Sequence, residues 1–378
     1  MTGPCVLDAW ISRECDGPEA LPLPDRVRAT QLRLLRQTLV WAATHSRFYK
    51  RTLAGRDLQL RSLAELARLP FTTVEDLRRW QDFLCISQGD VQRIVTLQTS
   101  GSTGLPKRLA FSEHDLKRTA LFFAVGMRQL IEPGQSLLVL LPGADRPDGV
   151  TDLLRQALSP AGIRVEGGDP AATPESLRED FERVRPDTVI GGPEQLEALL
   201  HAAARDATLH AAACHLRGAL SSGGVFRPEL QESISAAFSC LTLDHYGLTE
   251  SGFGGGVQCP AREGHHLREL DCLIEIIDPV TGVPLPEGQV GELVLTTLQR
   301  EAMPLVRYRT GDAASLLPGP CACGSPLHRL GPVLGRYVRE GDAIVLRAVP
   351  KGAGGALEGG RGTLYAPAKG FPFPLKNF

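Results

Sequence analysis

The stretch Thr96-Leu-Gln-Thr-Ser-Gly-Ser-Thr-Gly-Leu-Pro-Lys107 is the most informative part of this chain. Its centre, Thr99 to Gly104, contains only hydroxyl side chains and glycines. Glycines expose backbone N–H groups and hydroxyls add donors, a composition typical of a loop that holds phosphate oxygens. Lys107 adds a mobile positive charge. The pattern is neither the GxxxxGK[ST] loop nor the GxGxxG fingerprint, and a plain surface turn remains the alternative from these residues alone.

The composition is that of an ordinary globular protein. The 378 residues are 43% hydrophobic and 22% charged, and the formal net charge is −2, so neither a nucleic-acid nor a membrane partner is indicated. Charged residues interrupt the N-terminus, and no apolar run approaches the roughly 18 residues of a membrane span. We therefore expect a cytoplasmic protein. Nine mostly scattered cysteines favour reduced thiols over disulfides.

Hydrophobic patterning divides the chain into four parts. We expect a helical lead-in over 1–90, an α/β nucleotide-binding core over 91–256, a β-rich subdomain over 257–336 and a flexible tail over 337–378. In the core, short apolar runs alternate with helical segments, which predicts a mostly parallel sheet flanked by helices. Ligands of such sheets lie at the carboxyl ends of the strands, where the glycine clusters after residues 97, 190 and 222 fall.

Capping residues and periodicity locate the individual elements. Residues 1–24 look irregular, and Asp25 is the expected N-cap of a helix that runs to about Leu53. Ser112 begins a capping box and Thr173 precedes an N1 proline, so helices should follow both. The predicted strands are 91–97, 137–141, 162–165, 188–190, 216–220, 241–243, 274–278, 291–297 and 313–317.

Two later segments carry groups that suit a nucleotide. In the segment from Asp244 to Glu250, Tyr246 offers an aromatic face to a purine, and Glu250 offers a hard oxygen to Mg²⁺. In Arg307-Tyr-Arg-Thr-Gly-Asp312, the final carboxylate can accept hydrogen bonds from two ribose hydroxyls. Taken singly, the first segment is also compatible with an ordinary strand end and the second with a surface turn.

Together with Gly335-Arg336, these segments resemble the motifs of the adenylate-forming superfamily in order and spacing. The closer resemblance is to the phenylacetate–CoA ligase branch, and it covers roughly residues 25–336. It extends to the segments 45–50, 69–73, 275–279, 296–312 and 320–324. Ser222-Gly223-Gly224 departs from the Ser-Gly-Glu that relatives often have, which leaves the adenine side of the site open.

The resemblance implies the large N-terminal domain of an adenylate-forming enzyme, with mostly parallel sheets flanked by helices and a smaller β-rich subdomain. It also implies a role for each motif residue. Lys107, Thr249 and Glu250 would be catalytic, with Glu250 binding Mg²⁺. The nucleotide would be bound by Thr99, Ser100, Gly101, Ser102, Thr103, Gly104, Gly223, Gly224, Asp244, His245, Tyr246, Gly247, Thr249, Asp312 and Arg336.

The implied reaction joins a carboxylate to ATP, releases pyrophosphate and passes the acyl group to CoA. The difficulty is the approach of two anions, which Mg²⁺, loop N–H groups and Lys107 would relieve. ATP/AMP, Mg²⁺ and CoA are the expected cofactors. We expect the substrate to be an aryl or hydrophobic acid. Its pocket would be lined by Phe122, Phe123 or Phe253, although the first two also fit a helix core. A homodimer is expected because relatives are often dimers.

A second cluster of residues suits a metal. Cys321-Ala-Cys323 and the upstream Cys259, His265 and His266 offer soft ligands in two groups, which fits a tetrahedral structural Zn²⁺. Buried free thiols are the alternative. Some phenylacetate–CoA ligases bind zinc in a similar segment, and this resemblance favours Cys259, His266, Cys321 and Cys323, with His265 and His328 as other candidates.

The resemblance also leads us to expect a C-terminal domain of about a hundred residues after the Gly-Arg segment. This chain ends at residue 378, and no counterpart of that domain's catalytic lysine is identified; Lys351 and Lys369 are candidates in name only. Three hypotheses follow: a ligase completed by another chain or by dimerisation, a slow adenylating enzyme, or a nucleotide-binding scaffold without a complete reaction. Acid-dependent exchange of pyrophosphate into ATP would separate them.

Overall fold

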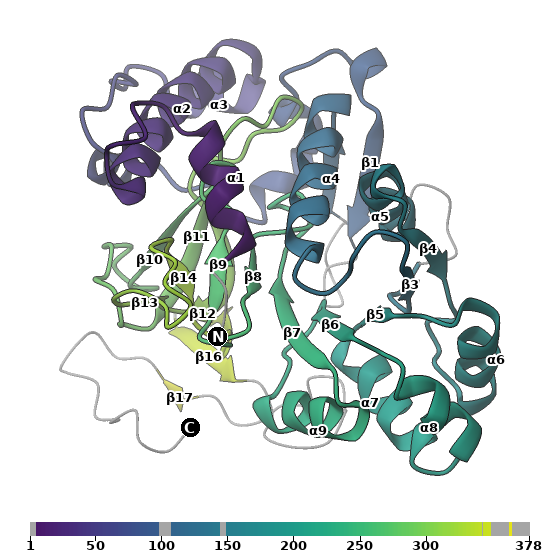
Figure 1. Cartoon of the computed structure of the whole chain (residues 1–378). Coiled ribbons are helices and arrows are strands. Elements are labelled where there is room, and N and C mark those ends of the chain that lie inside the picture. The colour runs from purple at the N-terminus through teal and green to yellow at the C-terminus, as the bar shows by residue number, and fades with distance from the viewer. Residues whose placement is uncertain (1–4, 98–106, 144–148, 342, 349–362, 365–378) are drawn as a thin grey trace.

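The computed structural model describes residues 5–97, 107–143, 149–341, 343–348 and 363–364 (Figure 1). The predicted phosphate-loop residues 99–104 lie outside this part of the chain. The described elements form two sheets, a nine-stranded mixed sheet and a six-stranded antiparallel sheet, and a small two-stranded ribbon. The ribbon pairs β1 (Arg93–Leu97) with β2 (Lys107–Phe111), so it brackets the predicted loop.

The lead-in is helical from its first described turn. Helix α1 (Val6–Glu14) buries Leu7, Trp10 and Ile11, so the expectation of an irregular segment up to residue 24 was wrong. Helix α2 (Leu23–His45) begins before Asp25, because Pro22 stands at its N-cap. The predicted single helix breaks at Ser46, whose side chain caps α3 (Arg47–Thr52). Three 3₁₀ turns follow, η1 (Leu63–Arg68), η2 (Asp76–Phe83) and η3 (Gln88–Asp90).

The nine-stranded sheet has the order β13-β14-β9-β8-β7-β6-β5-β3-β4. Its strands are β3 (Ser136–Val139), β4 (Arg164–Gly167), β5 (Thr188–Gly191), β6 (Gly218–Ser222), β7 (Leu241–Tyr246), β8 (Gly256–Gln258), β9 (His265–Leu267), β13 (Leu316–Leu317) and β14 (Arg329–Leu330). Strands β3 to β7 run parallel, as predicted, and pairing becomes antiparallel from β7 to β8. One sheet therefore crosses the boundary expected at residue 256.

Helices cover both faces of the parallel strands. They are α4 (Glu113–Met127), α5 (Val150–Leu158), α6 (Pro174–Val184), α7 (Pro193–Ala203), α8 (Ala207–Ala213) and α9 (Pro228–Phe238), with a 3₁₀ turn η4 (Ser159–Ala161). Leu137 belongs to the apolar cluster that includes α4 and α5, and Leu138 to the cluster of α6 to α9, because successive strand side chains point to opposite faces.

The helix caps agree with their sequence signals. Ser112 forms the capping box of α4 with Asp115, and Thr173 caps α6. Helix α8 was not predicted; Asp206 caps it through the Thr208 and Leu209 N–H groups. Phe122 on α4 is 1% exposed and lies in the core. In the described part of the chain, no helix combines the length and the apolar character needed to span a membrane.

The six-stranded sheet is antiparallel. Its order is β10 (Cys272–Ile277), β11 (Gly291–Thr297), β12 (Tyr308–Ala314), β15 (Gly335–Glu340), β16 (Ala343–Ala348) and β17 (Thr363–Leu364). Residues 337–340 and 343–348 therefore belong to a pair of antiparallel strands and not to the flexible tail that we expected to begin at 337. Burial of Tyr337 and Val345 stabilises it. Asp312 lies within β12 and not in a turn.

The lead-in is attached to this second sheet through Arg307. Its guanidinium is 2% exposed; it pairs with Glu275 and donates to the carbonyl oxygens of Ala67 and Leu69, each at 2.8 Å. Thr72 forms a β-bridge to Tyr308. Residues 67–72 are thereby held against the strand that carries Tyr308 and Asp312.

Candidate functional site

Glu250 is the centre of the first cluster of polar side chains. It is 3% exposed and lies on a turn just after β7, where the Ser251 and Phe253 N–H groups both donate to the Leu248 carbonyl. Lys107, the first residue of β2, forms an ion pair with Glu250 Oε1. Tyr308 Oη donates to the same oxygen at 3.0 Å. Two of the predicted catalytic residues, Lys107 and Glu250, are thus in contact, although 143 residues separate them.

Asp312 is the centre of a second group, beside the first. Its Oδ1 pairs with Arg336 Nε at 3.0 Å, and its Oδ2 accepts from Tyr246 Oη at 3.0 Å. Arg336 also donates to the Thr310 carbonyl. Burial raises the pKa of Asp312, although Arg336 lowers it in part. The three residues predicted to bind adenine and ribose are therefore together, and Asp312 contacts both of the others.

The remaining residues of the Asp244–Glu250 segment have other partners. Asp244 Oδ2 lies 3.0 Å from His265 Nε2. His245 Nδ1 lies 3.0 Å from Ser222 Oγ, and burial lowers the pKa of His245 to about 4, so its ring is neutral at pH 7. A Cβ at Gly247 would lie 2.6 Å from His245 Cε1 and 2.8 Å from the Phe253 carbonyl oxygen. Internal packing alone therefore accounts for glycine at 247.

Gly223, Gly224 and Thr249 follow the two neighbouring strands β6 and β7. Gly223 has φ +91, and a Cβ there would meet nothing within 4 Å. A Cβ at Gly224 would come within 3.0 Å of Pro193. Gly223 follows β6 and Thr249 follows β7, and these neighbouring strands end on the same edge of the sheet. This is the edge at which parallel sheets bind ligands.

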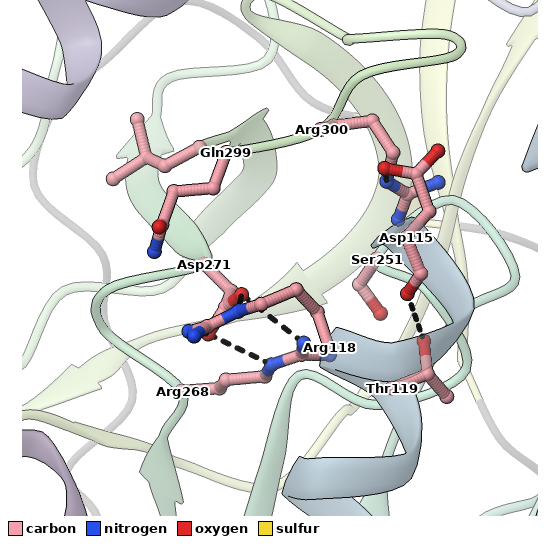
Figure 2. Close-up of a pocket in the computed structure, with 9 residues that line it drawn as sticks. Asp115, Arg118, Thr119, Ser251, Arg268, Asp271, Gln299 and Arg300 are labelled. Carbon is pink, nitrogen blue, oxygen red and sulfur yellow. Dashed lines mark hydrogen bonds and ion pairs between the residues drawn. The ribbon is translucent and has the colours of Figure 1, made fainter. Parts of the chain in front are cut away.

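A buried ionic network lies against the same turn (Figure 2). Arg118 of α4 binds both carboxylate oxygens of Asp271, at 2.8 and 2.7 Å, and pairs with Glu14 of α1. Burial raises the pKa of Asp271, but Arg268 and Arg118 outweigh this effect, and the pKa is lowered overall. Thr119 donates to the Gly252 carbonyl and so connects α4 to the Glu250 turn. No local pattern in the sequence indicated this network.

A cavity lies within this network. It measures about 10 Å³, close to the smallest volume that holds one water molecule. Arg300 borders it, lying 3.9 Å from Asp115 and facing the Phe111 ring at 4.7 Å. Asp115 accepts from the Glu301 and Ala302 N–H groups. The cavity is too small for a substrate, and its polar groups connect α4 to the loop around residue 300.

The candidate metal ligands form a separate cluster. Cys259, His266, Cys321 and Cys323 are all buried, and their ligand atoms lie within 4.8 Å of one another. The Cys259 and Cys321 sulfurs are 3.6 Å apart, and Cys323 Sγ is 3.5 Å from His266 Nε2. A zinc ion about 2.3 Å from each sulfur puts two sulfurs of a tetrahedron about 3.8 Å apart, so the four residues fit such an ion.

The two other candidate histidines have different partners. His265 pairs with Asp244, and His328 Nδ1 pairs with Glu269 Oε2 at 2.9 Å. Gly324, with φ +86, closes the turn after the last two cysteines through its N–H to the Cys321 carbonyl. Burial raises the pKa of Cys259 to about 12, so without a cation its thiol stays protonated; metal binding would release that proton.

The family that these motifs indicate is confirmed by comparison with known proteins. The family model of AMP-binding enzymes matches residues 87–299. The chain belongs to this family. It is 32% identical to a phenylacetate–coenzyme A ligase of Thermus thermophilus, over 88% of this chain and 75% of that protein. It is 30% identical to a phenylacetate–coenzyme A ligase of Pseudomonas putida, over 86% and 73%. This AMP-binding enzyme is therefore phenylacetate–CoA ligase-like.

The fold of this AMP-binding enzyme is also that of adenylate-forming CoA ligases. A 2-hydroxyisobutyryl-CoA ligase, crystallised in an open conformation with 2-HIB-AMP and CoA, superposes with a TM-score of 0.73. The alignment covers 86% of this chain and 79% of the other, at 23% identity, so it bears on the fold alone. The predicted fold class and family are both confirmed.

Proposed function

We propose that this enzyme activates a carboxylic acid with ATP, forms an acyl-adenylate with release of pyrophosphate, and then transfers the acyl group to CoA. The observation that carries the proposal is the meeting of Lys107, Glu250, Tyr246 and Asp312 at the edge where β6 and β7 end. Relatives named phenylacetate–coenzyme A ligase support the reaction type.

The residues of the site suit the electrostatic problem of this reaction. Lys107 would move from Glu250 to the phosphates, which places a positive charge where negative charge accumulates. Tyr246 would stack on adenine, and Asp312 would exchange its present donors for ribose hydroxyls. Glu250 would hold Mg²⁺, which neutralises phosphate charge when bound. Thr99 to Gly104 remain the predicted phosphate loop.

We also propose that Cys259, His266, Cys321 and Cys323 hold a structural zinc ion. A set of four soft, buried ligands leaves no open position for substrate, which is typical of structural zinc sites. The ion would join the strand β9 and the end of β8 to the turn at 321–324. The cluster would stabilise the fold and need not touch the reacting groups.

The proposed substrate is an aryl or other hydrophobic acid. The relatives named phenylacetate–coenzyme A ligase support this class. Phe253 also supports it, because its ring stacks on Phe111 at 5.2 Å beside the Glu250 turn. Phe122 is a core residue and is not part of this proposal. A cytoplasmic location and a homodimer stay predictions from the sequence.

The test is acid-dependent exchange of labelled pyrophosphate into ATP by the purified chain, across a panel of aryl and acyl acids with Mg²⁺. We expect exchange with at least one aryl acid and its loss in Lys107→Met. A second candidate, a nucleotide-binding protein without the reaction, is favoured by the mutual pairing of Lys107 with Glu250 and of Asp312 with Arg336. ATP or AMP protection against heating without any exchange would support that second candidate and contradict the first.

A further inference from the structure

Tyr308 on β12 contacts Glu250 on the turn after β7, but it has no role in the reaction as described so far. It is 2% exposed and is the first residue of β12. Its hydroxyl donates to Glu250 Oε1 at 3.0 Å. Its backbone is held on both sides, by the register pair with Leu295 of β11 and by the bridge to Thr72. The hydroxyl therefore projects toward Glu250 from a fixed position.

The two donors to Glu250 share one oxygen. Lys107 and Tyr308 both donate to Oε1, and Oε2 has no hydrogen-bond partner among the residues that the structure describes. A carboxylate held in this way keeps a fixed orientation and still offers one oxygen to a cation. Hydrogen bonds to the non-coordinating oxygen are a usual means of orienting a metal-binding carboxylate.

Only one of these two donors can remain when the nucleotide is bound. Lys107 is a flexible side chain that the proposed reaction moves to the phosphates. Tyr308 is a buried ring on a strand whose backbone is held on both sides, so its hydroxyl stays beside Glu250 Oε1. Tyr308 therefore supplies the donor that persists through the reaction.

We propose that Tyr308 is a positioning residue that holds Glu250 so that Oε2 binds Mg²⁺. This inference rests on the proposed function, in which Glu250 is the Mg²⁺ ligand. Without the hydroxyl, the Glu250 carboxylate can rotate once Lys107 leaves. Mg²⁺ binding would then have to order the carboxylate, which weakens the observed affinity. The loss should therefore appear in the Mg²⁺ requirement.

The experiment compares Tyr308→Phe with Tyr49→Phe in the full-length chain. Tyr49 is equally buried, and its hydroxyl accepts from the Val306 N–H at 2.8 Å, so it supports the same segment without touching Glu250. Both variants lose one buried hydroxyl. We expect Tyr308→Phe to raise the half-saturating Mg²⁺ concentration for exchange by about tenfold, the usual effect of removing an orienting hydrogen bond. Tyr49→Phe should leave it unchanged.

A binding measurement gives a second readout. Heat protection by ATP is titrated with Mg²⁺ in the absence of acid, and Tyr308→Phe should again need about tenfold more metal. Adding Tyr308→Phe to Glu250→Gln should change neither titration further, because Tyr308 acts through Glu250. Should Tyr308→Phe not fold, Tyr308→His, whose shorter ring does not reach Glu250, should raise the requirement in the same way.

The outcomes separate this inference from the proposed function. If none of the tested acids supports pyrophosphate exchange by the wild-type protein, that result counts against the proposed function. Wild-type protein that exchanges, with Tyr308→Phe and Tyr49→Phe showing equal Mg²⁺ titrations, overturns the role of Tyr308 and leaves the proposed function standing. An equal fall in exchange rate for both variants at every Mg²⁺ concentration also overturns it, because that result is a general loss of structure.

Discussion

The metal cluster and the nucleotide cluster are built in opposite ways. The four candidate ligands of the metal cluster are buried, and their ligating atoms converge within 4.8 Å of one another. In the nucleotide cluster, each carboxylate already has an internal partner: Glu250 has Lys107 and Tyr308, and Asp312 has Arg336 and Tyr246. The proposed zinc ion would complete the first arrangement, whereas the side chains of the second already pair with one another and would exchange partners in the proposed reaction.

This difference predicts opposite consequences for substitution. Removing a ligand of a permanent ion should destabilise the whole fold, because metal binding and folding share one free energy. Removing a charge from a site that serves a transient ligand should mainly reduce activity. Three measurements test this contrast.

The largest effect is expected for Cys321→Ser. Loss of a zinc ligand should lower the free energy of unfolding by more than about 4 kcal/mol, and metal analysis should no longer find zinc. Cys214→Ser is the control, since Cys214 is exposed and lies outside the cluster. Wild-type protein without zinc, or equal thermal unfolding of the two variants, would contradict a structural metal.

Glu250→Gln should affect activity more than stability. We expect pyrophosphate exchange to fall by about 10²–10³-fold, the usual effect of losing one electrostatic contact in a transition state. Unfolding should change far less than in Cys321→Ser. Glu14→Gln is the matched control: it removes a carboxylate that pairs with Arg118, another buried cation, and should keep exchange. Similar exchange in both variants would show that Glu250 has no special role.

The smallest effect is expected for His328→Gln, which also tests the choice of zinc ligand. The hydrogen bond to Glu269 raises the pKa of His328, despite the opposing effect of burial. The imidazolium therefore stabilises the fold below about pH 6.5, and this stability is lost as pH rises through the higher folded-state pKa. Because the side chain is 42% exposed, the gain is below about 1 kcal/mol.

Unfolding of His328→Gln and wild type should accordingly differ at pH 5.5 and converge in alkaline solution. Zinc content should be equal in the two proteins. Loss of zinc in His328→Gln would instead make His328 a ligand, and an unfolding difference that grows with pH would show that the sign of the pKa shift is wrong.

The parallel half of the fold was predictable because its signals are local. Continuous apolar runs such as 137–141 and caps such as Ser112 and Thr173 each depend on a few neighbouring residues. Of the antiparallel strands, β10 and β11 were predicted, over 274–278 and 291–297, but β8, β9 and β14 were not, since they are two or three residues long and show no period. The hairpin of β15 and β16 was also missed, although each of its strands is six residues long.

The site divides in a similar way. The resemblance identified the motif residues, and the structure brings Lys107 to Glu250 and Tyr246 to Asp312. The resemblance could not predict which of these residues contact one another. Tyr308 belongs to the motif over 307–312, but the sequence alone indicated no role for it. The Arg118–Asp271 pair joins residues that are 153 positions apart. Such contacts depend on the folded topology and leave no local pattern.

The attachment of the lead-in through Arg307 has a consequence for synthesis. Thr72 donates to the Val306 carbonyl, 234 residues later in the chain. At about 5–20 residues per second, a ribosome needs roughly 12–47 s to make that length. During this time the Ala67 and Leu69 carbonyls lack Arg307, and the apolar faces of the first helices lack their final cover. Residues 67–72 therefore cannot complete these native contacts until most of the chain has been synthesised.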